Sequence, residues 1–589
     1  MDLGDLPQWD LADLYDGPEA DELAADLDLA EAAAERFNGD YAGKVAGLSA
    51  PELARAISRY EADEDLLGRI ASYAQLYHAA RVSDREAGRF YQTNMERLSE
   101  ITTKLIFFTL ELNRIEDDAL AAQLAADEGL AHYAPWLRDV RASRPHQLSD
   151  EQERLLHEKQ VTGRAAWVRL FDETMADMRF AVDGEDRTLE QTLHLLSEPD
   201  VAQRKAAAKA LGVGFAEKKS LFALITNTLA KDKEIEDNWR HFARPDSARH
   251  LSNLVEDEVV DALADAVTAA YPRLSHRYYA LKARWFGVEA LDYWDRNAPL
   301  PDEDQRDFTF QAAQTQVLDA YRRFSPTLAD VGQRFFDNAW IDAPASPGKA
   351  AGAFAHPTVP SAHPYLLLNY QGRTRDVMTL AHELGHGVHQ VLAAGQGALM
   401  ADTPLTLAET ASVFGEQLTF RALLDQETAP GRRKAMLAGK TEDMLNTVVR
   451  QIAFYDFERR LHDERRQGEL SVERIGEIWL AVQGESLGPA IRLHDEYANY
   501  WCYIPHFIHS PFYVYAYAFG DCLVNSLYAV YQSAPDGFAE KYLDMLRAGG
   551  SLRHKDLLAP FGLNATDPQF WQQGLKVIEG FVDELEALS

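Results

Sequence analysis

The stretch from Ala381 to His386, Ala-His-Glu-Leu-Gly-His, constrains this chain most, because its H-E-x-x-H pattern carries three groups that can bind a metal or move a proton. The apolar residues of the surrounding segment repeat at helical spacing: Val377, Leu380, Ala381, Leu384, Val388 and Val391. We therefore predict a helix that Thr374 caps and Gly395 closes. At about 100° per residue, His382 and His386 fall on the face opposite the apolar stripe, one turn apart, where both could bind one ion.

A third metal ligand is expected further along the chain, because a catalytic zinc takes three protein ligands and keeps one position for water. Residues 406–416 have the pattern of a second helix that carries Glu409. Glu409 lies 23 residues after His386, which is far enough for the chain to turn and pack a second helix against the first. Ala411 and Ser412 are small and favour that close approach.

Alternatives remain open for several of these residues. Glu409 could instead form a capping box with Thr406 at the start of the second helix. Glu416, on the same face, is either a solvent-facing acid or a partner that orients a metal ligand. His389 lies one turn beyond the motif and could compete as a ligand, but a role in supporting the ligands or in lining the pocket is favoured. Gly385 and Gly387 are costly inside a helix, so we expect them to permit a close approach by a neighbouring segment.

The charge balance argues against two classes of partner. Lys and Arg total 59 and Asp and Glu total 93, which leaves a net charge of −34. We therefore expect neither nucleic acid nor an anionic membrane as a partner. The first residues show no secretory signal and no apolar stretch is long enough to span a bilayer, so a cytoplasmic location is expected. Cys502 and Cys522 are expected to be free buried thiols.

Capping patterns and helical periodicity predict two helical parts. Residues 1–187 are expected to form an amino-terminal helical lobe, with capping-box spacings at Ser49/Glu52, Ser83/Glu86 and Ser149/Gln152. Residues 188–589 are expected to form the catalytic part. Within it, Ala351–Phe354 and Tyr365–Tyr370 have the pattern of two short strands joined by a Pro-rich loop. Such a strand could pair with an extended peptide, or the two could form a hairpin that only packs.

Several stretches together resemble the oligoendopeptidase F branch of the thimet-oligopeptidase-like zinc metallopeptidases. The resemblance is carried by Gly348–Phe354, by Leu368–His389 with the motif, and by Ala408-Glu-Thr-Ala-Ser412. It is supported by Ile504-Pro-His-Phe507 and Pro511–Tyr517, and weakly by Trp9-Asp-Leu near the amino terminus. The similarity therefore runs nearly end to end.

The resemblance implies a metal site and a fold. His382, His386 and Glu409 would hold one Zn²⁺ per chain, and Glu383 would be the general base rather than a ligand. The fold would be mainly α, with two helical lobes flanking a deep substrate channel and a small β-sheet near the zinc site. The implied activity is that of a zinc-dependent oligoendopeptidase, which hydrolyses internal bonds of short extended oligopeptides with a zinc-activated water.

Further site residues follow from the same resemblance and from the strand pattern. His506, Tyr513 and Tyr517 are expected to be catalytic, as neutral donors that could stabilise the oxyanion. The residues expected to bind substrate are Gly352, Ala353, Phe354, His389 and Tyr515. An aromatic stripe at this spacing is otherwise more often part of a core. His509 departs from the family pattern, where an aromatic residue is expected, and this puts the assignment of the local donors in doubt.

Two other functions fit parts of this pattern. A helical zinc carboxypeptidase would remove residues singly from a carboxyl end rather than cut internally. A non-catalytic peptide-binding or chaperone-like protein could keep the same fold, although the intact Glu383 argues against it. The sequence leaves the oligomeric state open.

Overall fold

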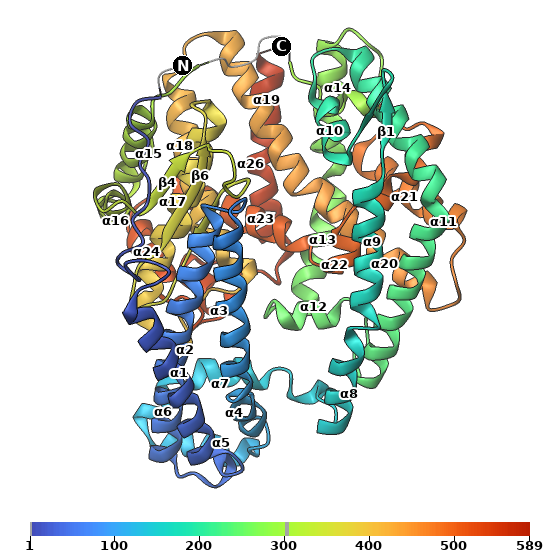
Figure 1. Ribbon diagram of the computed structural model, residues 1–589. Coiled ribbons are helices and arrows are strands. Elements are labelled where there is room, and N and C mark those ends of the chain that lie inside the picture. The colour runs from blue at the N-terminus through green and yellow to red at the C-terminus, as the bar shows by residue number, and fades with distance from the viewer. Residues whose placement is uncertain (1–2, 301–305, 589) are drawn as a thin grey trace. The chain divides into compact units, whose positions relative to one another are not determined.

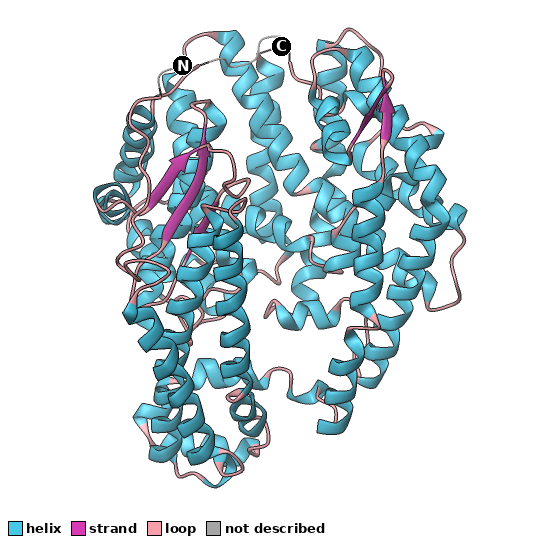
Figure 2. Cartoon of the chain, in the orientation of Figure 1, coloured by secondary structure: helices cyan, strands magenta, loops and turns pink. Residues whose placement is uncertain are grey.

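The computed structural model describes residues 3–300 and 306–588, and helices make up most of them (Figure 2). The expected mainly α class is confirmed. Contacts divide the chain into two compact units, each built from three segments. The first unit contains Met1–Arg144, Gln305–Gln426 and Tyr531–Gly562; the second contains Pro145–Asp304, Glu427–Val530 and Leu563–Ser589. The predicted division after residue 187 is a different one, because this position lies inside the second unit.

The first unit begins with seven α-helices, drawn from dark blue to cyan in Figure 1: α1 (Asp21–Tyr41), α2 (Ala50–Ala79), α3 (Arg85–Thr103), α4 (Ile106–Leu112), α5 (Asp117–Ala126), α6 (Glu128–His132) and α7 (Ala134–Arg141). The capping box predicted at Ser49 and Glu52 starts α2. The one predicted at Ser83 is wrong, because Asp84 caps α3 by accepting the backbone N–H of Glu86 at 2.8 Å.

A three-stranded sheet lies in the first unit, just before the motif helix. Its order is β4 (Ile341–Pro344), β6 (Tyr365–Tyr370) and β5 (Phe354–His356), with β4 parallel and β5 antiparallel to the central β6. The strand predicted at Tyr365–Tyr370 is confirmed. The strand expected at Ala351–Phe354 begins only at Phe354, because Gly352 has a φ of 81° and turns the chain before it. β5 is therefore an edge strand of this sheet.

The remaining helices of the first unit surround this sheet and the motif: α15 (Phe310–Phe324), α16 (Pro326–Asp337), α17 (Thr374–Ala393), α18 (Leu405–Gln426), α24 (Phe538–Arg547) and α25 (His554–Leu558). Ser325 caps a new helix at Pro326, so α15 and α16 are separate helices. Leu384 and Val388 of α17 are fully buried in the core of this unit.

The second unit is also mainly helical: α8 (Asp150–Gln160), α9 (Arg164–Asp177), α10 (Leu189–His194), α11 (Val201–Trp239), α12 (Ser247–Ser252), α13 (Asp257–Ala270), α14 (Ser275–Trp285), α19 (Pro430–Thr447), α20 (Val449–Arg465), α21 (Val472–Leu487), α22 (His506–His509), α26 (Pro568–Ala587) and most of α23 (Tyr515–Ser533). Its strands are the hairpin β1 (Phe180–Val182) and β2 (Glu185–Arg187), and the parallel pair β3 (Leu291–Asp292) and β7 (Ile491–Arg492).

Two further expectations can be compared with the structure. Cys502 and Cys522 are both buried and free, as predicted. In the part of the chain that the structure describes, no helix is both long enough and apolar enough to cross a membrane.

Candidate active site

The motif helix α17 forms where the periodicity predicts it, but its ends differ from the prediction. Arg373 rather than Thr374 is the N-cap residue, and its backbone N–H donates to Asp376 at 2.8 Å. At the other end the helix stops at Ala393 and a 3-10 turn continues to Gln396, so Gly395 does not close it. The helix and its apolar face were predicted correctly, because the residues that must be buried recur at the helical spacing.

The helices α17 and α18 cross at very short range beside the motif. A Cβ atom built on Gly385 would lie 2.5 Å from the carbonyl oxygen of Ala411 and 2.6 Å from the Cα atom of Ser412. Only glycine fits at this crossing. The expected close approach is confirmed, and it brings Glu409 of α18 next to the histidines of α17.

Replacing Gly385 with alanine should therefore loosen the crossing, because the atoms that the new methyl group meets are backbone atoms that cannot rotate away. Overpacking typically costs about 1–3 kcal/mol, which exceeds the gain of up to about 1 kcal/mol from helix propensity. We expect a lower melting temperature and weaker zinc binding. Gly395→Ala is the matched control, since no atom lies within 4 Å of its added Cβ. Equal behaviour of the two variants would contradict this packing.

His382, His386 and Glu409 form the one group of three or more potential metal ligands found among the described residues. Glu409 Oε2 lies 3.4 Å from His382 Nε2 and 3.5 Å from His386 Nε2. Ligands bound tetrahedrally at about 2.0–2.2 Å from one ion are about 3.4 Å apart, so these separations suit a shared zinc. The donor set of two imidazoles and a carboxylate also suits zinc chemistry. The capping-box alternative for Glu409 does not hold, because α18 begins at Leu405 and Thr406 lies inside it.

Outer partners hold these side chains in place. Glu416 Oε2 lies 3.4 Å from Nδ1 of His382, on the ring atom that faces away from Glu409. Ser412 Oγ donates a hydrogen bond to Glu409 Oε2 at 2.6 Å. Burial lowers the pKa of His382, but the surrounding carboxylates, led by Glu416, outweigh burial and raise this pKa to about 9. Of the two alternatives for Glu416, the geometry favours the partner that orients His382.

Glu416→Gln should weaken zinc binding without removing a ligand. The carboxylate that orients the imidazole of His382 and increases its basicity becomes a neutral amide. Changes of this kind typically cost about 10–100-fold in metal affinity or activity. Zinc affinity is measured by competition with a chromogenic chelator. A change below about threefold would show that Glu416 does not support the centre.

Glu383 lies next to the two histidines on α17 but does not belong to the ligand group. Its side chain is buried, with 7% of the residue surface exposed. Burial raises the pKa of Glu383 to about 7, while His382 and a backbone hydrogen bond from Ala355 lower it. A glutamate with a pKa near neutrality can both accept and return a proton.

The residues predicted to bind substrate at the strand lie beside this glutamate. Phe354 opens β5, and its neighbour Ala355 supplies the backbone hydrogen bond to Glu383. The carbonyl of Gly352 accepts a hydrogen bond from Asn369 at 2.8 Å, which fixes the turn that leads through Ala353 into the strand. An edge strand therefore runs next to the candidate general base.

His389 lies one turn beyond the motif, 5% exposed, and Thr403 Oγ1 is 3.3 Å from its Nε2. Burial lowers the pKa of His389 to about 4, so its ring is neutral near pH 7. His386 and His389 together line a pocket of about 550 Å³. The other side chains around this pocket come from Arg334 of α16, from the loop after β5, and from the stretch between Gln390 and Ala408 that links α17 to α18. His389 is thus placed to line a pocket, which was one of the two favoured roles.

Three of the predicted carboxy-terminal residues gather in the second unit. The rings of His506 and Tyr513 are stacked, with centroids 6.1 Å apart, and Tyr517 packs edge-on against Tyr513 at 5.3 Å. Nε2 of His506 lies 3.3 Å from the hydroxyl of Tyr517. Burial, with the positive charge of Arg450, lowers the pKa of His506, which favours a neutral imidazole.

The two other residues of this segment have different roles. Tyr515 is fully buried, and its hydroxyl accepts a hydrogen bond from Asn253 at 2.8 Å. This burial argues against the substrate contact predicted for Tyr515, because the aromatic spacing that suggested it belongs here to the core. His509 Nε2 lies 2.7 Å from Asp172 of α9, so its ring is held by that carboxylate.

A buried acid next to this segment gives a pH-dependent stability. Burial raises the pKa of Glu458 to about 8; the Phe512 N–H, Arg249 and Lys233 lower it, and Asp246 raises it. A carboxyl group whose pKa is raised by folding contributes fully to stability when the pH is below its pKa in the unfolded protein. This contribution is lost as the pH rises through its pKa in the folded protein. At 1.36 kcal/mol per pKa unit, the loss amounts to about 4 kcal/mol between pH 5 and 9. The melting temperature of wild type relative to Glu458→Gln should therefore fall over that range, and a constant difference would contradict the shift.

Sequence patterns missed one residue that supports the motif. The hydroxyl of Tyr321 on α15 donates to the carbonyl of Ala381 at 2.6 Å. A Cβ atom on Gly415 would lie 2.1 Å from that hydroxyl, so this glycine makes room for it. No motif surrounds Tyr321. The glycine on α18 was the only local sign of a close neighbour.

The site combines two imidazoles and a carboxylate with a separate buried glutamate, Glu383, which lies on the same helix as the two histidines. This combination defines a metal-dependent hydrolase of the H-E-x-x-H type. The sequence profile of peptidase family M3 matches residues 194–577, and the profile named Oligopeptidase F matches residues 111–180. The chain belongs to peptidase family M3, in its oligoendopeptidase F group, and is a metallo-oligopeptidase. The resemblance inferred from the motifs is confirmed.

Relatives cover almost the whole chain. Oligopeptidase PepF of Bacillus subtilis is 27% identical over 563 residues, which cover 93% of this chain and 82% of the relative. Group B oligopeptidase PepB of Streptococcus agalactiae is 25% identical, with 99% and 97% covered. Oligoendopeptidase-F of Enterococcus faecium has a similar structure, with a TM-score of 0.70, 23% identity, and coverage of 96% of this chain and 97% of that one. At this identity the structural likeness supports the fold.

Proposed function

We propose that this chain is a zinc-dependent oligoendopeptidase that hydrolyses internal peptide bonds of short, extended oligopeptides. The observation that carries the proposal is the juxtaposition of a three-ligand cluster with Glu383, which is buried beside the cluster and outside it. The two relatives named oligopeptidase support oligopeptides as the substrate class.

The residues fit one zinc ion, with His382, His386 and Glu409 as its ligands. A bound Zn²⁺ acidifies a water molecule and polarises the carbonyl of the bond to be cut. Burial lowers the pKa of His386, which keeps its imidazole neutral and able to bind a cation. Glu416 orients the ring of His382 from the opposite side.

Glu383 is the proposed general base. Its carboxylate accepts a proton from the attacking water and then delivers this proton to the leaving nitrogen of the peptide. In this proposal β5, which lies at the edge of its sheet, aligns the substrate, because an extended peptide can hydrogen-bond to an edge strand as an added strand. His389 lines the pocket that would receive a substrate side chain.

His506, Tyr513 and Tyr517 are the proposed oxyanion donors. Neutral phenol and imidazole groups can hydrogen-bond the oxyanion without competing for the metal. In this proposal they act on the oxyanion that forms at the carbonyl of the bond to be cut.

Mapping the products of a defined peptide library by mass spectrometry tests this function. Internal cuts that disappear with a chelator and return with zinc are expected. Residues released singly from carboxyl ends would instead favour the carboxypeptidase alternative. Absence of cleavage under all conditions, with peptide still bound, would favour a non-catalytic peptide-binding protein.

A further inference from the structure

Glu458 on α20 is a buried acid that the proposed chemistry does not use. Only 2% of its surface is exposed. Its Oε1 accepts the backbone N–H of Phe512 at 2.9 Å, while Oε2 has no hydrogen-bond partner among the described residues. Burying a carboxyl group costs free energy unless hydrogen bonds compensate for the lost hydration. The one hydrogen bond of the Glu458 carboxyl, to the Phe512 N–H, is therefore the contact to examine.

Phe512 has an unusual backbone conformation. Its φ is 59°, in the left-handed region that bulky residues rarely adopt. Its side chain is fully buried, and its ring packs against His462 at 4.8 Å and Tyr455 at 6.2 Å. Tyr455, Glu458 and His462 lie on one face of α20, at helical spacing. This face holds both the side chain and the backbone N–H of Phe512.

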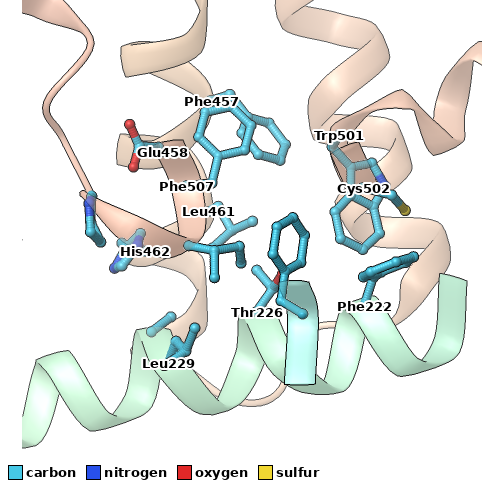
Figure 3. A pocket seen from close by; sticks show the side chains of 14 residues that line it. Phe222, Thr226, Leu229, Phe457, Glu458, Leu461, His462, Trp501, Cys502 and Phe507 are labelled. Carbon is cyan, nitrogen blue, oxygen red and sulfur yellow. The ribbon is translucent and has the colours of Figure 1, made fainter. Parts of the chain in front are cut away.

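Figure 3 shows the surroundings of the acid. Glu458 and His462 lie on one side of a small cavity, and Trp501 and Phe222 lie on the other. The cavity measures about 20 Å³, which is room for about one water molecule. The apolar wall opposite Glu458 leaves the carboxyl few polar partners besides the Phe512 N–H.

A second group holds the same turn from α12. Nε of Arg249 donates to the carbonyl of Pro511 at 3.2 Å, and its guanidinium lies 5.8 Å from the ring centre of Tyr513. The residues immediately before Tyr513 are thus fixed at the Pro511 carbonyl and at the Phe512 N–H. Both contacts hold the same peptide group, the one directly before Phe512, and the backbone N–H of Tyr513 itself donates to the carbonyl of Ser510 at 3.1 Å.

We propose that Glu458 and Arg249 are positioning residues that hold the Pro511–Phe512 turn, so that Tyr513 points its phenol at the oxyanion. This inference rests on the proposed function. Neither residue touches the substrate. Glu458 stabilises the left-handed conformation of Phe512 through its N–H, and Arg249 fixes the preceding carbonyl. Losing either contact lets the turn relax and misdirects the phenol.

A double-mutant cycle with Tyr513→Phe tests this coupling in the zinc-loaded enzyme, with a quenched oligopeptide as substrate. Glu458→Met keeps the size of the side chain but removes the acceptor, and Arg249→Met removes the donor. Each is expected to lower kcat by about 10–100-fold, since a misplacement near 1 Å can cost this much. KM should change by less than about threefold. In the Tyr513→Phe background, each of the two substitutions should lower kcat by less than about threefold, because the phenol hydroxyl that it positions is already gone.

Conservative and structural controls separate positioning from loss of fold. Glu458→Gln keeps an acceptor for the Phe512 N–H and should retain at least about half of the wild-type kcat. Leu461→Ala removes buried volume from the wall of the same cavity but no polar partner of the turn. It should lower the melting temperature and leave kcat within about twofold. If Glu458→Met does not fold, the Arg249→Met arm carries the same test.

The proposal would be overturned if Glu458→Met or Arg249→Met lowered kcat by the same factor in the Tyr513→Phe variant as in wild type. It would also be overturned if Glu458→Gln lowered kcat as much as Glu458→Met. An unaltered kcat in Glu458→Met or Arg249→Met would overturn it as well. A wild-type enzyme that cuts no peptide would instead refute the proposed function, so the two failures are distinguishable.

Discussion

Replacing Glu383 with glutamine is expected to abolish peptide hydrolysis while zinc binding is kept. Glutamine has nearly the same shape but cannot accept the proton of the attacking water. General acid–base catalysis contributes about 10²–10⁴-fold, so kcat should fall by at least this factor. Zinc content should stay near that of wild type, because Glu383 is not one of the three clustered ligands. Both quantities are measured on the same preparation.

A matched control separates this effect from burial. Glu427 has the same exposed fraction as Glu383, 7%, but lies in the second unit, where it pairs with Arg432. Glu427→Gln should keep kcat within about twofold, as expected for a substitution away from the reacting groups. Wild-type-like hydrolysis by the Glu383 variant would refute the assignment of the general base.

Replacing Glu409 with glutamine is expected to remove the metal and, with it, activity. The site loses its only anionic ligand, and the remaining amide is a poor ligand for zinc. Zinc affinity should fall by more than the roughly 10–100-fold expected when only an orienting partner is lost. Raising the free zinc concentration should restore part of kcat in this variant but none in the Glu383 variant.

Glu416→Gln is the control for this second prediction. Glu416 lies on the same helix and contacts the same histidine, but from the side away from the cluster. The zinc affinity of Glu416→Gln should lie between those of wild type and Glu409→Gln. Equal losses in the two variants would mean that the ligand and its supporting partner have been assigned wrongly.

Sequence periodicity was sufficient to predict the motif helix and its partner helix. The apolar stripe of α17 had to face a core, and this set the direction of His382 and His386. Small residues on α18 were enough to predict the close crossing, and the crossing is so close that no side chain fits at Gly385. Local patterns were less reliable at the helix ends, where Arg373 took the capping place expected for Thr374.

Features that depend on distant parts of the chain could not be predicted in this way. The pairing of β4 with β6 joins strands with no local signal for each other. The two compact units each combine three chain segments, so no single boundary in the sequence marks them. Aromatic spacing could not distinguish buried Tyr515 from its neighbours Tyr513 and Tyr517, because both faces of that segment carry tyrosines.

The central claim is that one zinc ion at His382, His386 and Glu409 makes this chain a peptidase. Titrating zinc into metal-stripped protein, while following hydrolysis of a quenched oligopeptide, tests it most directly. Activity should be absent at the start, rise linearly and stop rising at one zinc per chain. Full hydrolysis by the stripped protein, or an unchanged titration in Glu409→Gln, would contradict the claim.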